Sequence, residues 1–229
     1  DPTDRQGAAL NLQLIGKAPA SDALPSAFVE TLFDHYAGNF DDSLVDRLGY
    51  RLPELLDQAI RTARPGRFPL ALDLGCGTGL MGQRLRPIAG RLEGYDISTG
   101  MLKRARAKGV YDFLGKADLQ DFSYAGPKAE LVTVADVFIY VGALDGMVKT
   151  IAGLLAEDGL LAFSVERLSG SGDFVLLSSR RYAHSETYVR EILAANGFSI
   201  LSLETTVIRQ DRREPVDGLV VVAGKVHAA

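Results

Sequence analysis

The sequence predicts an α/β protein built on a doubly wound, mostly parallel sheet of seven strands, with one antiparallel strand near the edge and helices at the N-terminus. Strand and helix patterns alternate from residue 69 to residue 197, which is typical of a parallel sheet covered by helices on both faces. The last two strand patterns have no helix between them, which predicts the antiparallel member. A glycine-rich segment at 75–79 follows the first strand, where open α/β sheets bind their ligands.

The composition indicates a globular protein with a single sizeable core. The 229 residues are 47% hydrophobic and 24% charged. A net charge of −4 disfavours a nucleic-acid partner, because phosphate binding requires clustered Lys and Arg. With one cysteine and three scattered histidines, an internal disulfide is impossible and no metal site is expected. No apolar run approaches the roughly 18 residues of a membrane helix, and no secretory signal opens the chain. We therefore expect a cytoplasmic protein without a membrane partner.

The N-terminal part is predicted to hold an extension at 1–24 and a helical cap at 25–62. The apolar residues of the first cap helix recur on one helix face: Val29, Leu32, Phe33 and Tyr36. Further helices are expected at 44–48 and 53–60, the latter with Pro53 in its first turn.

A single domain at 25–229 is predicted, with a Rossmann-like core at 68–229. Strands are expected at 69–75, 91–96, 111–117, 130–138, 159–166, 198–207 and 218–226. Helices are expected at 81–88, 98–108, 144–155 and 185–196. Ser98 and Ser185 are expected N-caps, and Asn196-Gly197 is an expected left-handed C-cap. The segment 168–184 is expected to form a hairpin or a lid.

The loop that begins at Asp73 indicates a ligand site. Gly75 and Gly77 can adopt positive φ angles and let the backbone approach a ligand, and the following helix directs free amides into the crevice. The spacing is G-x-G-x-G, whereas dinucleotide loops have G-x-G-x-x-G, and this disfavours NAD. Asp73 would crowd a pyrophosphate but suits an ammonium group or a water network. The acidic loop therefore favours S-adenosylmethionine, whose sulfonium and ammonium groups are cationic. A tight turn without a ligand is the alternative.

The stretch ALDLGCGTG at 71–79 resembles the first motif of the class I S-adenosylmethionine-dependent methyltransferases. Later segments resemble their further motifs: YDIS at 95–98 with Met101, KADL at 116–119, and VADVFIYV at 134–141. The resemblance implies that Asp96 bonds the ribose hydroxyls and that Asp118 accepts the adenine amino group. It implies that Ile97 and Met101 flank the adenine. The implied cofactor site comprises Tyr36, Asp73, Gly75, Cys76, Gly77, Asp96, Ile97, Met101, Asp118, Leu119 and Ala135.

Structural roles remain open for several of these residues. Asp96 can also cap a helix, and Asp118 can be a plain surface acid. Tyr36 can pack in the core instead of closing over the cofactor. Cys76 is expected to be a small buried residue of the loop rather than a nucleophile, because no base is identifiable beside it.

A narrower resemblance is to tetratricopeptide-associated, ubiquinone-methyltransferase-like methyltransferases. It is carried by FDHYAGNFD at 33–41 and RYAHS at 181–185. It implies that residues 1–16 form the tail of a helical repeat. It does not supply a substrate.

The acceptor site is predicted near the end of the candidate lid. His184 has the pKa range of a general base, with helix entry as its alternative role. Tyr140 follows the fourth strand near the methyl end and is the second catalytic candidate. Arg181, Tyr182 and Glu166 are candidates for binding the acceptor.

The sequence thus predicts direct in-line transfer of a methyl group from S-adenosylmethionine to an acceptor. The candidate pocket is apolar and poor in Lys and Arg, which favours a small organic acceptor. A non-catalytic binding protein with the same fold is one alternative. An NAD-dependent oxidoreductase and an RNA methyltransferase are weaker ones. The sequence predicts no oligomeric state.

Overall fold

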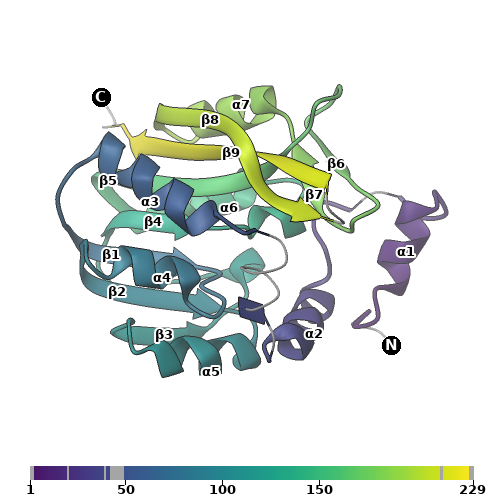
Figure 1. Ribbon diagram of the computed structural model, residues 1–229. Helices are drawn as coiled ribbons and strands as arrows, with labels where there is room; N and C mark the ends of the chain where they lie inside the picture. The colour runs from purple at the N-terminus through teal and green to yellow at the C-terminus, as the bar shows by residue number, and fades with distance from the viewer. Residues whose placement is uncertain (1–2, 20, 39, 42–48, 212–213, 227–229) are drawn as a thin grey trace.

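The structure is a computed structural model that describes residues 3–19, 21–38, 40–41, 49–211 and 214–226. Its strands are β1 (Phe68–Leu74), β2 (Ala89–Asp96), β3 (Phe113–Lys116), β4 (Ala129–Val134), β5 (Leu155–Arg167), β6 (Phe174–Leu176), β7 (Tyr182–His184), β8 (Phe198–Asp211) and β9 (Glu214–Lys225). They form one sheet in the order β3-β2-β1-β4-β5-β7-β6, and β9 pairs with both β5 and β8 (Figure 1).

The predicted fold class is confirmed. All seven expected strands are present, and β9 runs antiparallel to β5 and β8 next to the sheet edge. The described part of the chain has nine strands rather than seven because the 168–184 segment is a hairpin. Its strands β6 and β7 pair antiparallel with each other, and β7 also pairs in parallel with the last residues of β5.

The helices are α1 (Ala8–Leu14), α2 (Ser26–Tyr36), α3 (Leu52–Ala63), α4 (Leu80–Leu85), α5 (Thr99–Lys108), α6 (Asp145–Leu154) and α7 (Glu186–Ala195), with 3₁₀ turns η2 (Leu119–Asp121) and η3 (Phe138–Tyr140). Ser98 and Ser185 accept hydrogen bonds from Met101 N and Tyr188 N, as expected of N-caps. Gly197 adopts φ 75°, as expected of a left-handed C-cap. The helix expected at 44–48 lies outside the described residues.

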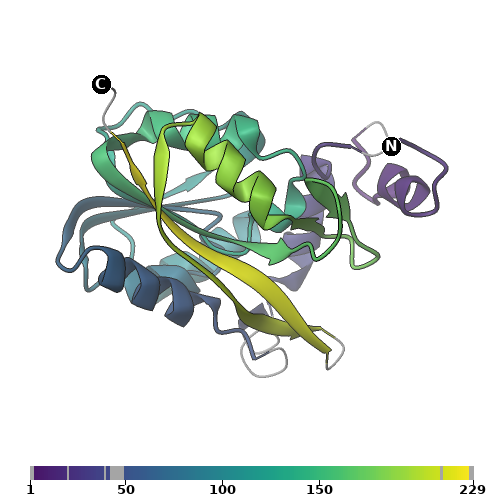
Figure 2. The ribbon, with the colours of Figure 1, turned by 90° about the horizontal axis from the view of Figure 1, so that it is seen from above.

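Helices cover both faces of the sheet, so the central strands are buried on both sides. Leu72 of β1 packs in a core with α6 and α7, whereas Ala71 packs in a second core with α3 and α4. Figure 2 shows these two helix pairs on opposite sides of the sheet. Alternate residues of a strand point to opposite faces, and this accounts for the nearly unbroken apolar runs of the central strands.

The N-terminal segment packs beside the carboxyl ends of the strands (Figure 1). Leu24 N donates to Tyr140 O at 3.0 Å, and Tyr182 Oη donates to Ser21 O at 2.7 Å. Leu10, Leu24 and Phe28 share a small core with Tyr182. Of the predicted helical cap, α2 lies beside the strand ends, whereas α3 packs on the sheet. A role of the first residues as the tail of a helical repeat stays a prediction.

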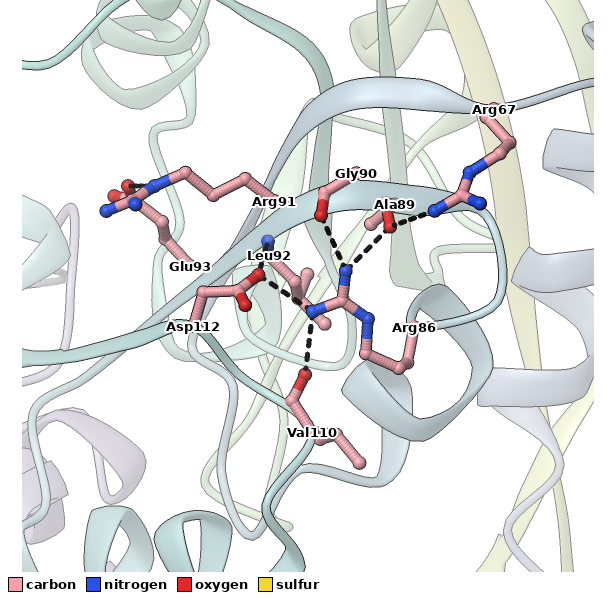
Figure 3. Close-up of polar contacts among 9 residues, drawn as sticks. All are labelled: Arg67, Arg86, Ala89, Gly90, Arg91, Leu92, Glu93, Val110 and Asp112. Atoms are coloured by element: carbon pink, nitrogen blue, oxygen red, sulfur yellow. Dashed lines mark hydrogen bonds and ion pairs between the residues drawn. The ribbon is translucent and has the colours of Figure 1, made fainter.

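Arg86 fixes the opposite, amino ends of β2 and β3 (Figure 3). Its Nη1 donates to Val110 O at 3.2 Å and to Asp112 Oδ2 at 2.7 Å, and its Nη2 donates to Ala89 O at 2.6 Å and Gly90 O at 2.9 Å. Arg67 adds a 3.1 Å bond to Ala89 O. These bonds tie the starts of β2 and β3 to the end of α4.

No helix within the described ranges is both long and apolar enough to cross a bilayer.

Candidate ligand-binding site

A cavity of about 410 Å³ opens at the carboxyl edge of the sheet. Much of its lining comes from α2, the glycine loop after β1, the segments that follow β2, β3 and β4, the turn between β6 and β7, and the end of β8. Five parallel strands, β1 to β5, direct their carboxyl ends to this edge, which is where open α/β sheets bind ligands. The fold therefore places the cavity where the sequence predicted a site.

The glycine loop takes a conformation that other residues adopt only with strain. Gly75, Gly77 and Gly79 have φ angles of 73°, 53° and 92°. A Cβ on Gly75 would lie 2.2 Å from Cγ2 of Val137, so the loop can pack against the segment after β4 only with glycine there. A Cβ on Gly77 would meet no protein atom within 4 Å. Both glycines line the cavity, so the backbone at Gly77 is open to a ligand.

Asp96 ends β2 at the cavity and also ties the glycine loop to the next helix. Its Oδ2 accepts a 2.8 Å hydrogen bond from Gly77 N, and its Oδ1 accepts one of the same length from Ser98 N. Burial raises its pKa to about 6, and the backbone hydrogen bonds oppose that rise. The carboxylate is therefore ionised at neutral pH and has lone pairs left for a ligand.

The adjoining strand ends contribute further predicted residues to the cavity wall. Ile97, Asp118, Leu119 and Ala135 all line it, as do Cys76 and Tyr36. The Asp118 side chain caps η2 by accepting a 2.9 Å bond from Gln120 N. The Cys76 thiol is buried, and burial raises its pKa well above the usual value, which argues against a nucleophilic role.

Two predicted cofactor residues, Asp73 and Met101, do not line the cavity. Asp73 is fully buried; it accepts hydrogen bonds from Tyr111 Oη at 2.6 Å and Thr133 Oγ1 at 2.8 Å. Burial raises the pKa of Asp73 to about 6. Met101 is fully buried on α5. Both residues support the site from behind, since their side chains are already packed or hydrogen-bonded within the protein.

Helix α2 roofs the cavity and is pinned to α5 by polar contacts that the sequence prediction did not include. Asp34 Oδ1 accepts bonds from Ser98 Oγ at 2.5 Å and Gly100 N at 2.9 Å. Lys116 pairs with Glu30 at 2.6 Å. On the cavity side, Phe33 packs edge-on against Tyr140 with ring centroids 5.4 Å apart.

A buried charge cluster lies at the far end of the cavity, and its centre is Arg209, which no sequence signal identified. Arg209 Nη1 donates to Asp136 Oδ1 at 2.7 Å, and its Nη2 donates to Glu166 Oε1. Burial alone would lower the pKa of Arg209, but Asp136 and Glu166 raise it and keep the guanidinium charged. Its Nε atom is buried without a hydrogen-bond partner in the described part of the chain.

Three arginines line this end of the cavity: Arg180, Arg181 and Arg209. The expectation of an Arg-poor pocket is therefore wrong, because the chain brings these residues together from the β6–β7 turn and from β8. Of the predicted acceptor residues, Arg181 and Tyr140 line the cavity. Burial raises the pKa of Tyr140, so this phenol keeps its proton at neutral pH.

His184, Tyr182 and Glu166, three of the predicted acceptor residues, are not among the residues that line the cavity. His184 is fully buried in β7, and its Nε2 donates to the carbonyl oxygens of Val141 and Gly142, each 3.0 Å away. A general base must reach the proton that it removes, and this ring has no access to the cavity. Tyr182 is bonded to Ser21, and Glu166 is paired with Arg209.

The buried imidazole of His184 predicts a pH dependence of stability. Burial lowers its pKa to about 4, and the two carbonyl hydrogen bonds only partly offset this. The buried Nδ1 has no hydrogen-bond partner among the described residues, so a proton added to it would have no acceptor. Because the unfolded state binds this proton near pH 6.5, stability is fully present above that pH and falls as pH drops from 6.5 to 4.

The measurement is chemical denaturation at pH 7 and pH 5 of the wild type, His184→Gln and His35→Gln. Between these pH values the wild type should lose roughly 1–2 kcal/mol more than His184→Gln. His35 is exposed on α2, so His35→Gln should match the wild type. Asp73 and Asp96 titrate in all three proteins, so their contributions to the change in unfolding free energy cancel when the proteins are compared. Equal losses in the wild type and His184→Gln would contradict the buried neutral histidine.

Comparison with known proteins agrees with this geometry. Residues 72–163 match the family described as a methyltransferase domain. Human methyltransferase-like protein 27 is 37% identical over 120 residues, which are 51% of this chain but only 47% of that protein. The chain thus spans about half the length of that relative. Magnesium-protoporphyrin O-methyltransferase of Synechocystis is 26% identical over 205 residues, covering 80% of this chain and 88% of that protein.

The fold also matches solved structures. The N-methyltransferase NodS of Bradyrhizobium japonicum, in complex with S-adenosylhomocysteine, superposes with a TM-score of 0.68 at 21% identity, over 86% of this chain and 98% of that one. Fold and site together define a Rossmann-like α/β protein with a cavity at the carboxyl edge of its sheet. More particularly, residues 72–163 match the methyltransferase-domain family, and the fold is shared with solved S-adenosylmethionine-dependent methyltransferases.

Proposed function

We propose that the protein binds S-adenosylmethionine in this cavity and transfers its methyl group to a small organic acceptor. The observation that carries the proposal is the joint placement of the glycine loop and Asp96 on one cavity wall. A carboxylate at the end of β2 can accept hydrogen bonds from the two ribose hydroxyls. S-adenosylhomocysteine in the similar NodS structure and the methyltransferase family match support the same cofactor.

The residues that line the cavity fit this cofactor. The open backbone at Gly77 offers close approach to a ligand, and Asp96 supplies the acceptor oxygens. Ile97 and Leu119 offer apolar contact for a purine, with Asp118 beside them. Tyr36 is about half exposed at the cavity mouth, which suits an aromatic side chain that closes over the bound molecule.

When bound, the cofactor would supply an electrophilic methyl group. The acceptor forms a bond to the methyl carbon while the bond between that carbon and the cofactor's sulfur breaks. The protein's own contribution is to hold both molecules in line and to exclude water, which contributes up to about 7–11 kcal/mol in favourable model reactions. Tyr140 keeps its proton, so we assign it a hydrogen-bond donor role toward the acceptor rather than the role of a base. Because the buried His184 cannot remove a proton from the acceptor, the acceptor must be nucleophilic without its help.

The alternatives make different predictions for one turnover experiment. The protein is incubated with S-adenosylmethionine and a pool of small organic acceptors, and release of S-adenosylhomocysteine is measured, with Asp96→Ala as the control. Methyl transfer predicts release that requires an acceptor and is lost in the variant. Tight binding of S-adenosylhomocysteine without release on any acceptor would instead favour a non-catalytic binding protein.

A further inference from the structure

The turn between β6 and β7 places an unpaired cation at the acceptor end of the cavity. Arg180 lines the cavity and is exposed. The other two cavity arginines have carboxylate partners: Arg181 pairs with Asp211 at 3.0 Å, and Arg209 pairs with Asp136 and Glu166. Within the described residues, no carboxylate lies in ion-pair distance of Arg180 and no hydrogen bond satisfies its guanidinium.

The backbone at Arg180 has a conformation that does not favour arginine. Arg180 N donates to Leu177 O at 2.9 Å, and Leu177 N donates to Arg181 O at 2.8 Å, which closes a three-residue hairpin loop. The last loop residue of such a hairpin is left-handed and is usually glycine or asparagine. Arg180 holds this position with φ 62°, a conformation that is strained for a residue with a Cβ atom. The geometry of the turn therefore does not explain why an arginine occupies this position.

Two neighbouring polar atoms are also unsatisfied. Ser179 Oγ and Arg209 Nε are buried and have no hydrogen-bond partner among the described residues, and both residues line the cavity. A guanidinium N–H can only donate, and a serine hydroxyl can donate as well. Arg180, Ser179 and Arg209 therefore each have a hydrogen-bond donor that an acceptor oxygen of a ligand could satisfy.

Aromatic rings from α2 and η3 also line the cavity. Phe33 packs edge-on against Phe40 and Tyr140, with ring centroids 6.0 and 5.4 Å away. All three rings line the cavity together with Tyr36. A ligand that fills the space between these rings and Arg180 needs an apolar body and an oxyanion at one end.

We propose that the acceptor end of the cavity binds an apolar or aromatic carboxylate, whose carboxylate group is held by Arg180. A guanidinium matches a carboxylate with two parallel hydrogen bonds, which gives recognition as well as affinity. This proposal rests on the proposed function, because it assigns the cofactor to the other end of the same cavity. β7 lies three strand positions from β1, so the turn that carries Arg180 and the glycine loop come from strands that are not neighbours in the sheet.

The test is calorimetric titration of protein saturated with S-adenosylhomocysteine. The probes are three acid–amide pairs: 3-phenylpropanoate, 2-naphthoate and octanoate, each with its carboxamide. The variants are Arg180→Gly, which suits the left-handed backbone and so retains the fold, and Arg167→Gln, which removes an exposed arginine at the end of β5 that does not line the cavity.

We expect at least one acid to bind the wild type about 10- to 100-fold more tightly than its amide, the range for one hydrogen bond to a charged group. Arg180→Gly should abolish this preference, and Arg167→Gln should keep it. Equal binding of acids and amides, no binding of any acid, or an unchanged preference in Arg180→Gly would overturn the proposal. Weaker S-adenosylhomocysteine binding in Arg180→Gly would also overturn it, by assigning Arg180 to the cofactor's own carboxylate. Failure of the wild type to bind S-adenosylhomocysteine would instead overturn the proposed function.

Discussion

Replacing Asp96 with alanine is expected to weaken the binding of S-adenosylhomocysteine by at least about 100-fold. Under the proposed function, the carboxylate accepts hydrogen bonds from the ribose, and each such bond to a charged group contributes about 1.5–3 kcal/mol. The substitution also frees Gly77 N and Ser98 N, which Asp96 now holds at 2.8 Å. The loss therefore combines a missing ligand contact with a glycine loop that is less well ordered.

Asp112→Ala is the matched control for this substitution. Asp112 also accepts a backbone hydrogen bond, from Leu92 N at 2.7 Å, and pairs with Arg86, but it does not line the cavity (Figure 3). Calorimetric titration should give Asp112→Ala an affinity within about threefold of the wild type, as expected for a site that shares no partners with the ligand. Comparable losses in both variants, or an Asp96→Ala affinity close to that of the wild type, would contradict the ribose contact.

Replacing Arg209 with methionine is expected to lower the free energy of unfolding by about 3–5 kcal/mol, because removing one member of a buried charge cluster leaves the others uncompensated. Asp136 and Glu166 both bond to this guanidinium, and Glu166 is buried with it. Denaturant unfolding without ligand measures the effect. The loss should be visible in the absence of any cofactor.

Two further variants separate this cause from a general effect of the substitution. Arg190→Met removes an exposed helix pair with Glu186 and should change stability by less than about 1 kcal/mol. Adding Glu166→Gln to Arg209→Met should recover part of the loss, since it removes one uncompensated charge. A small effect of Arg209→Met, or no recovery in the double variant, would show that the ion pairs do not stabilise the fold.

The sequence predicts the glycine loop, the positions of seven strands along the chain and the place of Asp96 at the end of the second strand because their signals are local. Strand patterns, glycine spacing and capping residues each lie within a few residues of the structure that they specify. The segment at 168–184 was predicted only as a hairpin or a lid. Its choice between them depends on β7 pairing with the end of β5, a contact that no local pattern encodes.

The acceptor end could not be predicted because it depends on a β-bulge and on packing between distant segments. The register of β8 shifts between Val207 and Arg209, so Ile208 and Arg209 are both buried although they are neighbours in a strand. A regular alternation would place Arg209 on the opposite face from Ile208. The sequence prediction ended this strand at residue 207 and therefore missed the central arginine.

Burial explains why His184, Asp73 and Met101 do not line the cavity. Each lies within a few residues of a cavity-lining residue, so its position in the sequence resembles that of a site residue. The direction of each side chain is set by partners far away in the chain, such as Tyr111 for Asp73 and Val141 for His184.

Calorimetric titration of the wild-type protein with S-adenosylmethionine, S-adenosylhomocysteine and NADH tests the central claim most directly. The glycine spacing, Asp96 and the fold predict micromolar binding of the first two compounds and no binding of NADH. Binding of NADH, or binding of none of the three, would contradict the assignment of this cavity to a sulfonium cofactor.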